Sequence, residues 1–301
     1  MADLTGKVLG GRYRVQEFLG RGGVAEVYRA WDARRGIEVA LKFLREDLAE
    51  DRAFVRRFRR EAQVLEKLRH PNIVRYYGFE EMEGQAFLVM EFIRGVSLRR
   101  YLHELGRPLT VGEAVTVLEP VCKALHYAHA EGVLHCDVKP GNILLERGGR
   151  VVLSDFGIAR WAEGGGSTVT VVGSPAYMAL EQVRGQGLGV WTDVYGLGVT
   201  VYEMLTLRRP FPGERGKGTT RERVLWEQMH IEPRSLRDHN PQVPVQVEEV
   251  VRRALRKEPG DRPGDVLEVL RGVAQGVKAE PLKGLEEGRE RERRELERGR
   301  A

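Results

Sequence analysis

The feature that most constrains the fold is a change in hydrophobic periodicity along this chain of 301 residues. Over residues 12–44 apolar and polar side chains alternate around glycines, which predicts antiparallel strands. Residues 47–69 repeat apolar side chains every three or four positions, as an amphipathic helix does, and Pro71 is expected to end that helix. Two further strands are predicted over 73–79 and 86–92. The front of the chain should therefore form a small antiparallel sheet with one main helix.

After Gly95 the pattern becomes mostly helical. Helices are predicted over 97–105, 111–131, 193–207, 221–229, 245–255 and 266–273. The predicted fold class is therefore α+β, with a small antiparallel β lobe and a larger, mostly α-helical lobe. The predicted parts are an N-terminal extension over 1–11, the small lobe over 12–94, the large lobe over 95–275, and a charged tail, helical or disordered, over 276–301.

The composition limits the classes of protein and partner. Hydrophobic residues make up 42% of the chain and charged residues 31%, which is typical of a globular protein with room for two lobes. The formal charge of +5 is too small to indicate a nucleic-acid partner. No signal-peptide pattern and no membrane-spanning run of about 18 apolar residues occurs, and there are two cysteines. We expect a cytoplasmic chain without a membrane span.

A glycine-rich stretch, residues 20–23, lies between two predicted strands. Dinucleotide-binding loops lie instead between a strand and a helix, so this context favours a hairpin that folds over phosphates as a lid. An ordinary hairpin turn is the alternative. Lys42 follows on an apolar strand and Glu61 on the next helix, where a carboxylate could hold the lysine. A surface lysine is the common alternative, and Glu66 offers a second carboxylate on the same helix.

The segment from His135 to Asn142 reads His-Cys-Asp-Val-Lys-Pro-Gly-Asn. Phosphoryl transfer to a hydroxyl needs a carboxylate to orient it, a cation near the γ-phosphate and an oxygen ligand for a metal ion. Asp137, Lys139 and Asn142 supply these groups in one short segment. Asp155 could form a turn, but together with Asn142 it would make a hard-oxygen site suited to Mg²⁺.

In this order and spacing the motifs resemble the catalytic domain of the bacterial eukaryotic-like Ser/Thr protein kinases, over about residues 12–270. The Asp-x-Lys-Pro-x-Asn form is similar to Ser/Thr kinases rather than tyrosine kinases. The chain departs from the family pattern at three positions. Ala25 replaces the third glycine of the loop, Leu180 replaces a proline, and Cys136 replaces the arginine that clamps an activation-loop phosphate. We therefore expect that clamp to be absent or weak.

The resemblance implies specific roles. Asp137 would be the catalytic base, with Lys139, Lys42 and Glu61 as further catalytic residues, and His135 would be a packed, structural imidazole. Asn142 and Asp155 would bind Mg²⁺ or Mn²⁺. The residues implied to bind ATP are Leu19, Gly20, Arg21, Gly22, Gly23, Val24, Ala25, Glu26, Val27, Ala40, Lys42, Met90, Glu91, Phe92, Ile93 and Leu144, with the backbone of Glu91 and Ile93 against the purine edge.

The segment 173–181 resembles the part of the family that closes the activation loop. By that resemblance Ser174 would lie near Asp137 and Lys139 and position the substrate hydroxyl. Glu181 should pair with Arg262, and Asp193 should brace the catalytic loop. The hydroxyls between Asp155 and Glu181 that are expected to be autophosphorylated are Ser167, Thr168 and Thr170.

The function implied by the resemblance is Mg-ATP-dependent phosphorylation of Ser and Thr hydroxyls on proteins, including the enzyme itself. Its partners would be ATP and protein substrates, and a transient homodimer is compatible with this reading. A pseudokinase that serves as a nucleotide-binding scaffold is one alternative, which the survival of all five ATP- and metal-handling groups disfavours. A small-molecule phosphotransferase is another, which the complete segment 173–181 disfavours because that segment presents a peptide.

Overall fold

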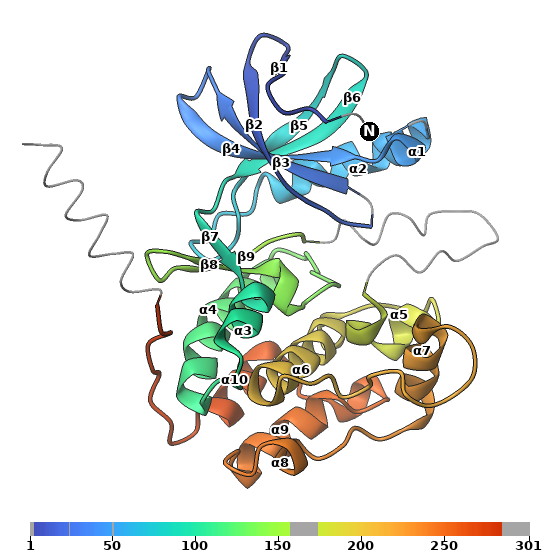
Figure 1. Cartoon of the computed structure of the whole chain (residues 1–301). Helices are drawn as coiled ribbons and strands as arrows, with labels where there is room; N and C mark the ends of the chain where they lie inside the picture. Colours follow the sequence, from blue (N-terminus) through green and yellow to red (C-terminus); the bar gives the residue numbers. More distant parts are fainter. Residues whose placement is uncertain (1–2, 24, 50, 157–173, 285–301) are drawn as a thin grey trace, which may run out of the picture. The chain divides into compact units, whose positions relative to one another are not determined.

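The computed structural model describes residues 3–23, 25–49, 51–156 and 174–284. They divide into two compact units, residues 3–93 and residues 94–156 with 174–284 (Figure 1). The first unit is built on an antiparallel sheet and the second mostly from helices. This confirms the predicted α+β fold class. In the part of the chain that is described, no helix is long and apolar enough to cross a membrane.

The sheet of the first unit has six strands in the order β1-β2-β3-β4-β6-β5, each antiparallel to its neighbours. Its core contains Tyr13, Phe43 and Phe87, with ring centroids of Tyr13 and Phe43 at 5.7 and 4.8 Å from that of Phe87. The strands are β1 Val8–Leu9, β2 Tyr13–Arg21, β3 Ala25–Asp32, β4 Ile37–Leu44, β5 Tyr76–Met82 and β6 Gln85–Glu91, and the helices are α1 Glu46–Ala49 and α2 Arg52–Leu65.

Two details of this unit differ from the sequence patterns. The helix predicted over 47–69 is split into α1 and α2, because the Asp51 carboxylate accepts a hydrogen bond from the Phe54 amide (3.1 Å) and begins a second helix. Within the predicted extension, Val8–Leu9 form β1, and Leu4 and Leu9 are buried in the core of the sheet. The N-terminal segment thus completes one edge of this core.

In the second unit a three-stranded sheet in the order β7-β8-β9 accompanies the helices. The elements are β7 Gly95–Ser97, α3 Leu98–Leu105, α4 Val111–Ala130, η1 Pro140–Asn142, β8 Ile143–Glu146, β9 Val151–Leu153, η3 Pro175–Tyr177, α5 Leu180–Val183, α6 Val190–Thr206, α7 Thr220–His230, α8 Leu236–His239, α9 Val245–Ala254, η4 Pro259–Asp261 and α10 Val266–Ala274. Polar caps begin several helices as their sequences suggest. Thr110 and Glu113 form a capping box at the start of α4, and Ser97 caps α3.

Helix α6 is the central core helix of this unit and packs against α4, α9 and α10 (Figure 1). It is buried along almost its whole length. Two glycines permit this close packing. A Cβ atom at Gly198 would lie 2.9 Å from the Cβ of Ala254 in α9, and one at Gly196 would lie 3.1 Å from the carbonyl oxygen of Val138. The helix therefore supports the loop that contains the predicted catalytic residues.

After α10 the chain runs back over the start of α4. We call residues 277–283 the C-terminal strap; they lie within the predicted charged tail and are not helical. The Glu280 amide donates to the Gly112 carbonyl (3.1 Å), and the Thr110 hydroxyl donates to the Glu280 carboxylate (2.6 Å). Leu282 is buried. These contacts make the strap part of the helix-rich unit.

Candidate active site

Two predicted catalytic-loop residues of the second unit donate to one carboxylate oxygen of a third. Lys139 Nζ donates to Asp137 Oδ2 at 2.5 Å, and Asn142 Nδ2 donates to the same oxygen at 3.0 Å. Asn142 Nδ2 also donates to the Asp137 carbonyl at 2.9 Å. The Asn142 amide therefore turns its nitrogen toward Asp137, which leaves its oxygen as the atom suited to a metal ion.

The turn that precedes Asp137 is held by Asp193 of α6. Its buried carboxylate accepts hydrogen bonds from the His135 amide (2.9 Å) and the Cys136 amide (2.7 Å). Cys136 has a φ of 59°, in the left-handed region, so this backbone conformation needs such support. The predicted bracing role of Asp193 is confirmed. His129 of α4, which the sequence patterns missed, lies 2.7 Å from the same carboxylate through Nε2.

His135 is fully buried, and its ring packs at 4.6 Å, centroid to centroid, from that of Phe156. Its Nε2 lies 2.9 Å from the Ser154 carbonyl, so Nε2 carries the proton that is donated there. Nδ1 accepts a hydrogen bond from the Asp137 amide at 3.2 Å. Burial lowers the pKa of this imidazole and keeps it neutral. Both ring nitrogens are engaged, which confirms the prediction of a packed, structural histidine.

The predicted metal ligands Asn142 and Asp155 belong to neighbouring segments. The Ser154 amide and hydroxyl both donate to the Asn142 carbonyl, at 2.9 and 3.1 Å, and Asp155 follows directly with a left-handed φ of 63°. Among the described residues no group of three His, Cys, Asp or Glu side chains forms a metal cluster. One carboxylate and one amide oxygen suit Mg²⁺, which keeps several waters and shares substrate phosphates. Leu144, two residues beyond Asn142, pairs with Val152 in the same small sheet.

The segment that begins at Ser174 reaches the same loop. The Lys139 ammonium donates to the Ser174 hydroxyl at 3.1 Å, as well as to Asp137. At the other end of the segment, Arg262 forms a bidentate ion pair with Glu181, at 2.7 and 3.0 Å, and both side chains are buried. Both predicted contacts are confirmed. The substrate-positioning role of Ser174 stays a prediction.

In the first unit the glycine-rich stretch forms the expected hairpin between β2 and β3. Gly20 pairs with Val27, and the Gly22 amide donates to the Ala25 carbonyl at 2.8 Å to close the turn. Arg21 and Glu26 flank the turn with an ion pair of 2.6 Å. Val24 lies outside the described residues.

Neither Gly20 nor Gly23 has a positive φ, and a Cβ atom at either would meet no atom of the described residues within 4 Å. Packing within the protein therefore does not explain these two glycines. Close approach of a ligand to the backbone would explain them, since a phosphate held by a glycine loop needs that space. The nucleotide-binding role of the hairpin stays a prediction.

Lys42 is 6% exposed and lies opposite Val27 of β3 and Leu88 of β6. Burial of an ammonium group is costly without an anionic partner, so the surface-lysine alternative is contradicted. Glu61 lies on α2, as predicted. The pairing of Lys42 with Glu61 stays a prediction.

The predicted adenine-binding residues of this unit lie on β2, β3, β4, β6 and the segment after β6. Ala40 pairs with Met90, and both are buried, whereas Leu19 is 43% exposed. The Glu91 amide donates to the Arg75 carbonyl, so a purine would use the Glu91 carbonyl. Phe92 and the buried Ile93 end the unit. The predicted phosphosites Ser167, Thr168 and Thr170 lie outside the described residues.

Comparison with known proteins decides the family. A family model described as "Protein kinase domain" matches residues 13–274. The chain belongs to the protein kinase family. Membership implies the use of ATP and a divalent metal ion.

Several curated relatives of this kinase domain come from bacteria. It is 39% identical to the probable serine/threonine-protein kinase SCO3848 of Streptomyces coelicolor, over 84% of this chain and 38% of that protein. It is likewise 39% identical to PrkC of Bacillus subtilis, over 86% and 39%, and to PknB of Mycobacterium tuberculosis, over 84% and 41%. The chain thus spans about two fifths of the length of these relatives. The crystal structure of the M. tuberculosis PknI kinase domain matches with a TM-score of 0.72 at 29% identity, covering 91% of this chain and 99% of that one.

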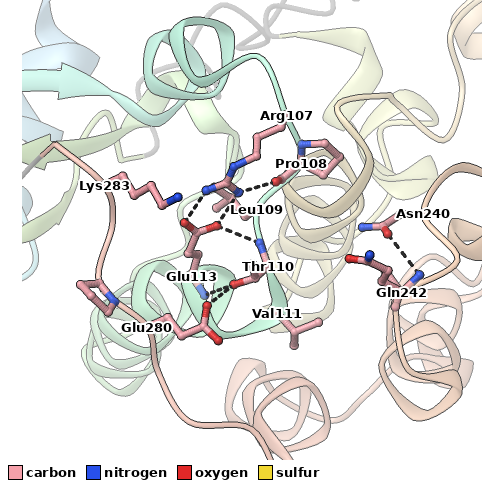
Figure 2. Close-up of a pocket in the computed structure, with 12 residues that line it drawn as sticks. Arg107, Pro108, Leu109, Thr110, Val111, Glu113, Asn240, Gln242, Glu280 and Lys283 are labelled. Atoms are coloured by element: carbon pink, nitrogen blue, oxygen red, sulfur yellow. Dashed lines mark hydrogen bonds and ion pairs between the residues drawn. The ribbon is translucent and has the colours of Figure 1, made fainter.

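A separate pocket of about 760 Å³ lies within the helix-rich unit of the kinase domain (Figure 2). Its walls come from the start of α4, the segment after α8 and the C-terminal strap. Arg107 forms a bidentate ion pair with the buried carboxylate of Glu113 on one wall, and Asn240 and Gln242 lie on the opposite side. None of the predicted site residues lines this pocket.

Sequence patterns missed several residues that hold the candidate site. Gln182 of α5 donates from Nε2 to the Cys136 carbonyl at 2.8 Å, and Gln228 of α7 donates to the Pro175 carbonyl at 2.7 Å. Thr192 donates to Glu181 at 2.9 Å. Each acts through a contact between distant segments, which no local pattern marks.

Proposed function

We propose that this kinase domain transfers the γ-phosphoryl group of ATP to Ser and Thr hydroxyls of proteins. The observation that carries the proposal is the convergence of Lys139 and Asn142 on Asp137 Oδ2, with the Ser174 hydroxyl on the same ammonium group. This arrangement combines a carboxylate, a cation and an amide oxygen beside a segment suited to a peptide. Those groups are what transfer to a protein hydroxyl requires.

In this proposal Asp137 orients the substrate hydroxyl and accepts its proton. Lys139 lies between Asp137 and Ser174, so its ammonium group can neutralise charge that develops on the transferred phosphoryl group. Asn142 and Asp155 would hold Mg²⁺, which supplies charge neutralisation on the phosphates when bound. Lys42, with Glu61, would hold the α- and β-phosphates under the glycine hairpin.

The two alternatives are less well supported. A pseudokinase would not need Asp137, Lys139 and Asn142 to share a hydrogen-bonded cluster, and the curated relatives carry the names of Ser/Thr kinases. A small-molecule phosphotransferase would not need the segment from Ser174 to Glu181 to be anchored at both ends.

Three further expectations belong to the same proposal. Autophosphorylation would fall on Ser167, Thr168 or Thr170, and transfer from one copy to another would need a transient homodimer. A cytoplasmic location remains a prediction that rests on the use of ATP and on two free cysteines.

The test is incubation of the purified chain with γ-labelled ATP, Mg²⁺ and a generic Ser/Thr protein substrate, followed by phosphosite mapping. We expect label on Ser and Thr, and none with Asp137→Asn. Absence of label from the wild-type protein, with nucleotide binding shown separately, would favour the pseudokinase. Label on a small metabolite but not on protein would favour the other phosphotransferase.

A further inference from the structure

Gln182 joins the peptide-presenting segment to the backbone next to Asp137. Its Oε1 accepts a hydrogen bond from the Ala179 amide at 3.0 Å, and its Nε2 donates to the Cys136 carbonyl at 2.8 Å. The amide orientation follows from these partners, because the reversed side chain would place oxygen against a carbonyl and nitrogen against an N–H. The side chain therefore makes two directional contacts, one within its own segment and one to the catalytic loop.

The Cys136 carbonyl belongs to the peptide group that precedes Asp137. The other end of that peptide group, the Asp137 amide, donates to His135 Nδ1 at 3.2 Å. Gln182 and His135 thus hold the two ends of one peptide plane. The orientation of that plane sets the direction in which the Asp137 side chain leaves the backbone. Cys136 has left-handed φ, so the plane lies at a point where the backbone is strained.

Gln182 is itself anchored through its neighbour in the chain. Glu181 is held by the buried Arg262 fork and by the Thr192 hydroxyl. Helix α5 is thereby fixed to the core of the unit, and the Gln182 side chain extends from a fixed base. A rigid base is what a positioning contact needs, since a mobile one would not constrain its partner.

We propose that Gln182 is a positioning residue, which orients the proton-accepting carboxylate of Asp137 through the Cys136 carbonyl. This inference rests on the proposed phosphoryl transfer and assigns a further residue to it. Its contact couples the segment that begins at Ser174 to the catalytic loop. The contact also lies on the residue that replaces the family's arginine, and it uses the backbone there rather than the side chain.

Two substitutions by side chains of similar length distinguish this role from simple capping of α5. Gln182→Glu keeps an acceptor for the Ala179 amide but places a carboxylate against the Cys136 carbonyl. Gln182→Met keeps the length and removes both bonds. The exposed Gln186, on the same segment and with no hydrogen bond of its side chain among those described, provides the control Gln186→Ala.

The measurement is steady-state transfer to a Ser/Thr protein substrate, with kcat and the KM for ATP determined separately and the melting temperature recorded. We expect kcat to fall about tenfold in both Gln182 variants, which corresponds to ~1.4 kcal/mol in the barrier. The KM for ATP should change less than about twofold, because the hydrogen bonds described for the Gln182 side chain go to Ala179 and Cys136, and neither is a predicted nucleotide residue. Gln186→Ala should match the wild-type protein.

Wild-type kcat in Gln182→Glu, with loss only in Gln182→Met, would overturn the proposal and assign Gln182 to capping of α5. If kcat and the melting temperature fall together in both Gln182 variants, Gln182 supports folding, and the proposal is overturned. No transfer by the wild-type protein would count against the proposed function itself, and with it against a role for Gln182 in transfer.

Discussion

Arg262 and Glu181 are separated by 81 positions in the chain and form a buried, bidentate ion pair. The remaining guanidinium donors reach the carbonyls of Trp191, Arg256 and Lys257. Full hydrogen bonding is what makes a buried pair tolerable, since either charge alone in this place would be strongly unfavourable. The pair fixes α5, and through α5 the approach of Gln182 to the catalytic loop.

We expect Glu181→Ala to lower the free energy of unfolding by about 3–5 kcal/mol, because it leaves the Arg262 guanidinium buried without its carboxylate. The exposed pair of Glu214 with Arg234 provides the control, and Glu214→Ala should cost less than about 1 kcal/mol. Urea unfolding of the wild-type protein and of the two variants measures both changes in the free energy of unfolding. A similar small effect for the two variants would show that the buried pair contributes little.

Activity should depend on the two carboxylates of the candidate site. Asp137→Asn removes the proposed proton acceptor, and Asp155→Asn removes the charge of the proposed metal ligand. We expect phosphoryl transfer to fall about a hundredfold or more in each, with the fold intact. Transfer assays beside circular dichroism provide the measurement. Wild-type turnover in either variant would refute the role proposed for that residue.

Gly196 of α6 should be sensitive to a single methyl group. Its Cβ would lie 3.1 Å from the Val138 carbonyl oxygen and 3.2 Å from the Val138 Cβ, next to Asp137. Alanine gains about 1 kcal/mol of helix propensity, which offsets part of an overpacking cost of roughly 1–3 kcal/mol. We therefore expect Gly196→Ala to reduce kcat about tenfold while the melting temperature changes little. Gly187→Ala should leave both unchanged, because a Cβ there meets no atom of the described part of the chain within 4 Å.

The lowered pKa of Lys257 predicts that the stability of the protein depends on pH. Its ammonium group donates to the Gln228 and Ile231 carbonyls at 2.5 and 2.7 Å and lies 4.2 Å from the centroid of the Phe211 ring. Burial lowers its pKa to about 8. The unfolded chain keeps this proton up to about pH 10.5, so between pH 8 and 10.5 it binds more protons than the folded chain, and stability rises with pH.

Lys257→Met removes that titration. The difference in unfolding free energy, wild type minus Lys257→Met, should therefore increase as the pH is raised from 8 toward 10.5. Urea unfolding of both proteins at several pH values in this window measures the difference. A flat or falling difference would contradict the lowered pKa of Lys257.

The C-terminal strap should stabilise the helix-rich unit. A Cβ at Gly112 would lie 2.6 Å from the Glu280 side chain and 2.7 Å from the Lys278 carbonyl oxygen. We expect Gly112→Ala to displace the strap and lower stability by about 1–3 kcal/mol. In a chain that ends at residue 275 the same substitution should have no such cost. A cost that persists after truncation would show that the strap does not press on α4.

Elements with strong periodicity were predicted well, because their hydrophobic pattern and caps are local. Helix α4 was expected over 111–131 and spans Val111–Ala130, and α10 was expected over 266–273 and spans Val266–Ala274. The errors occurred at the boundaries of elements. Asp51 begins a new helix inside one predicted period, and the strand predicted from residue 73 begins only at Tyr76.

The sequence by itself determined the chemistry of the candidate site, because Asp137, Lys139 and Asn142 belong to one short loop whose residue types already limit what it can do. Only the tertiary structure decided how that loop is held. Gln182 meets the Cys136 carbonyl, and His129 meets Asp193, across 46 and 64 positions of the chain. In the first contact the acceptor is a backbone carbonyl, and every residue has one. The residue type therefore does not indicate which carbonyl will accept a hydrogen bond from a distant side-chain amide. Long-range packing alone selects the partner.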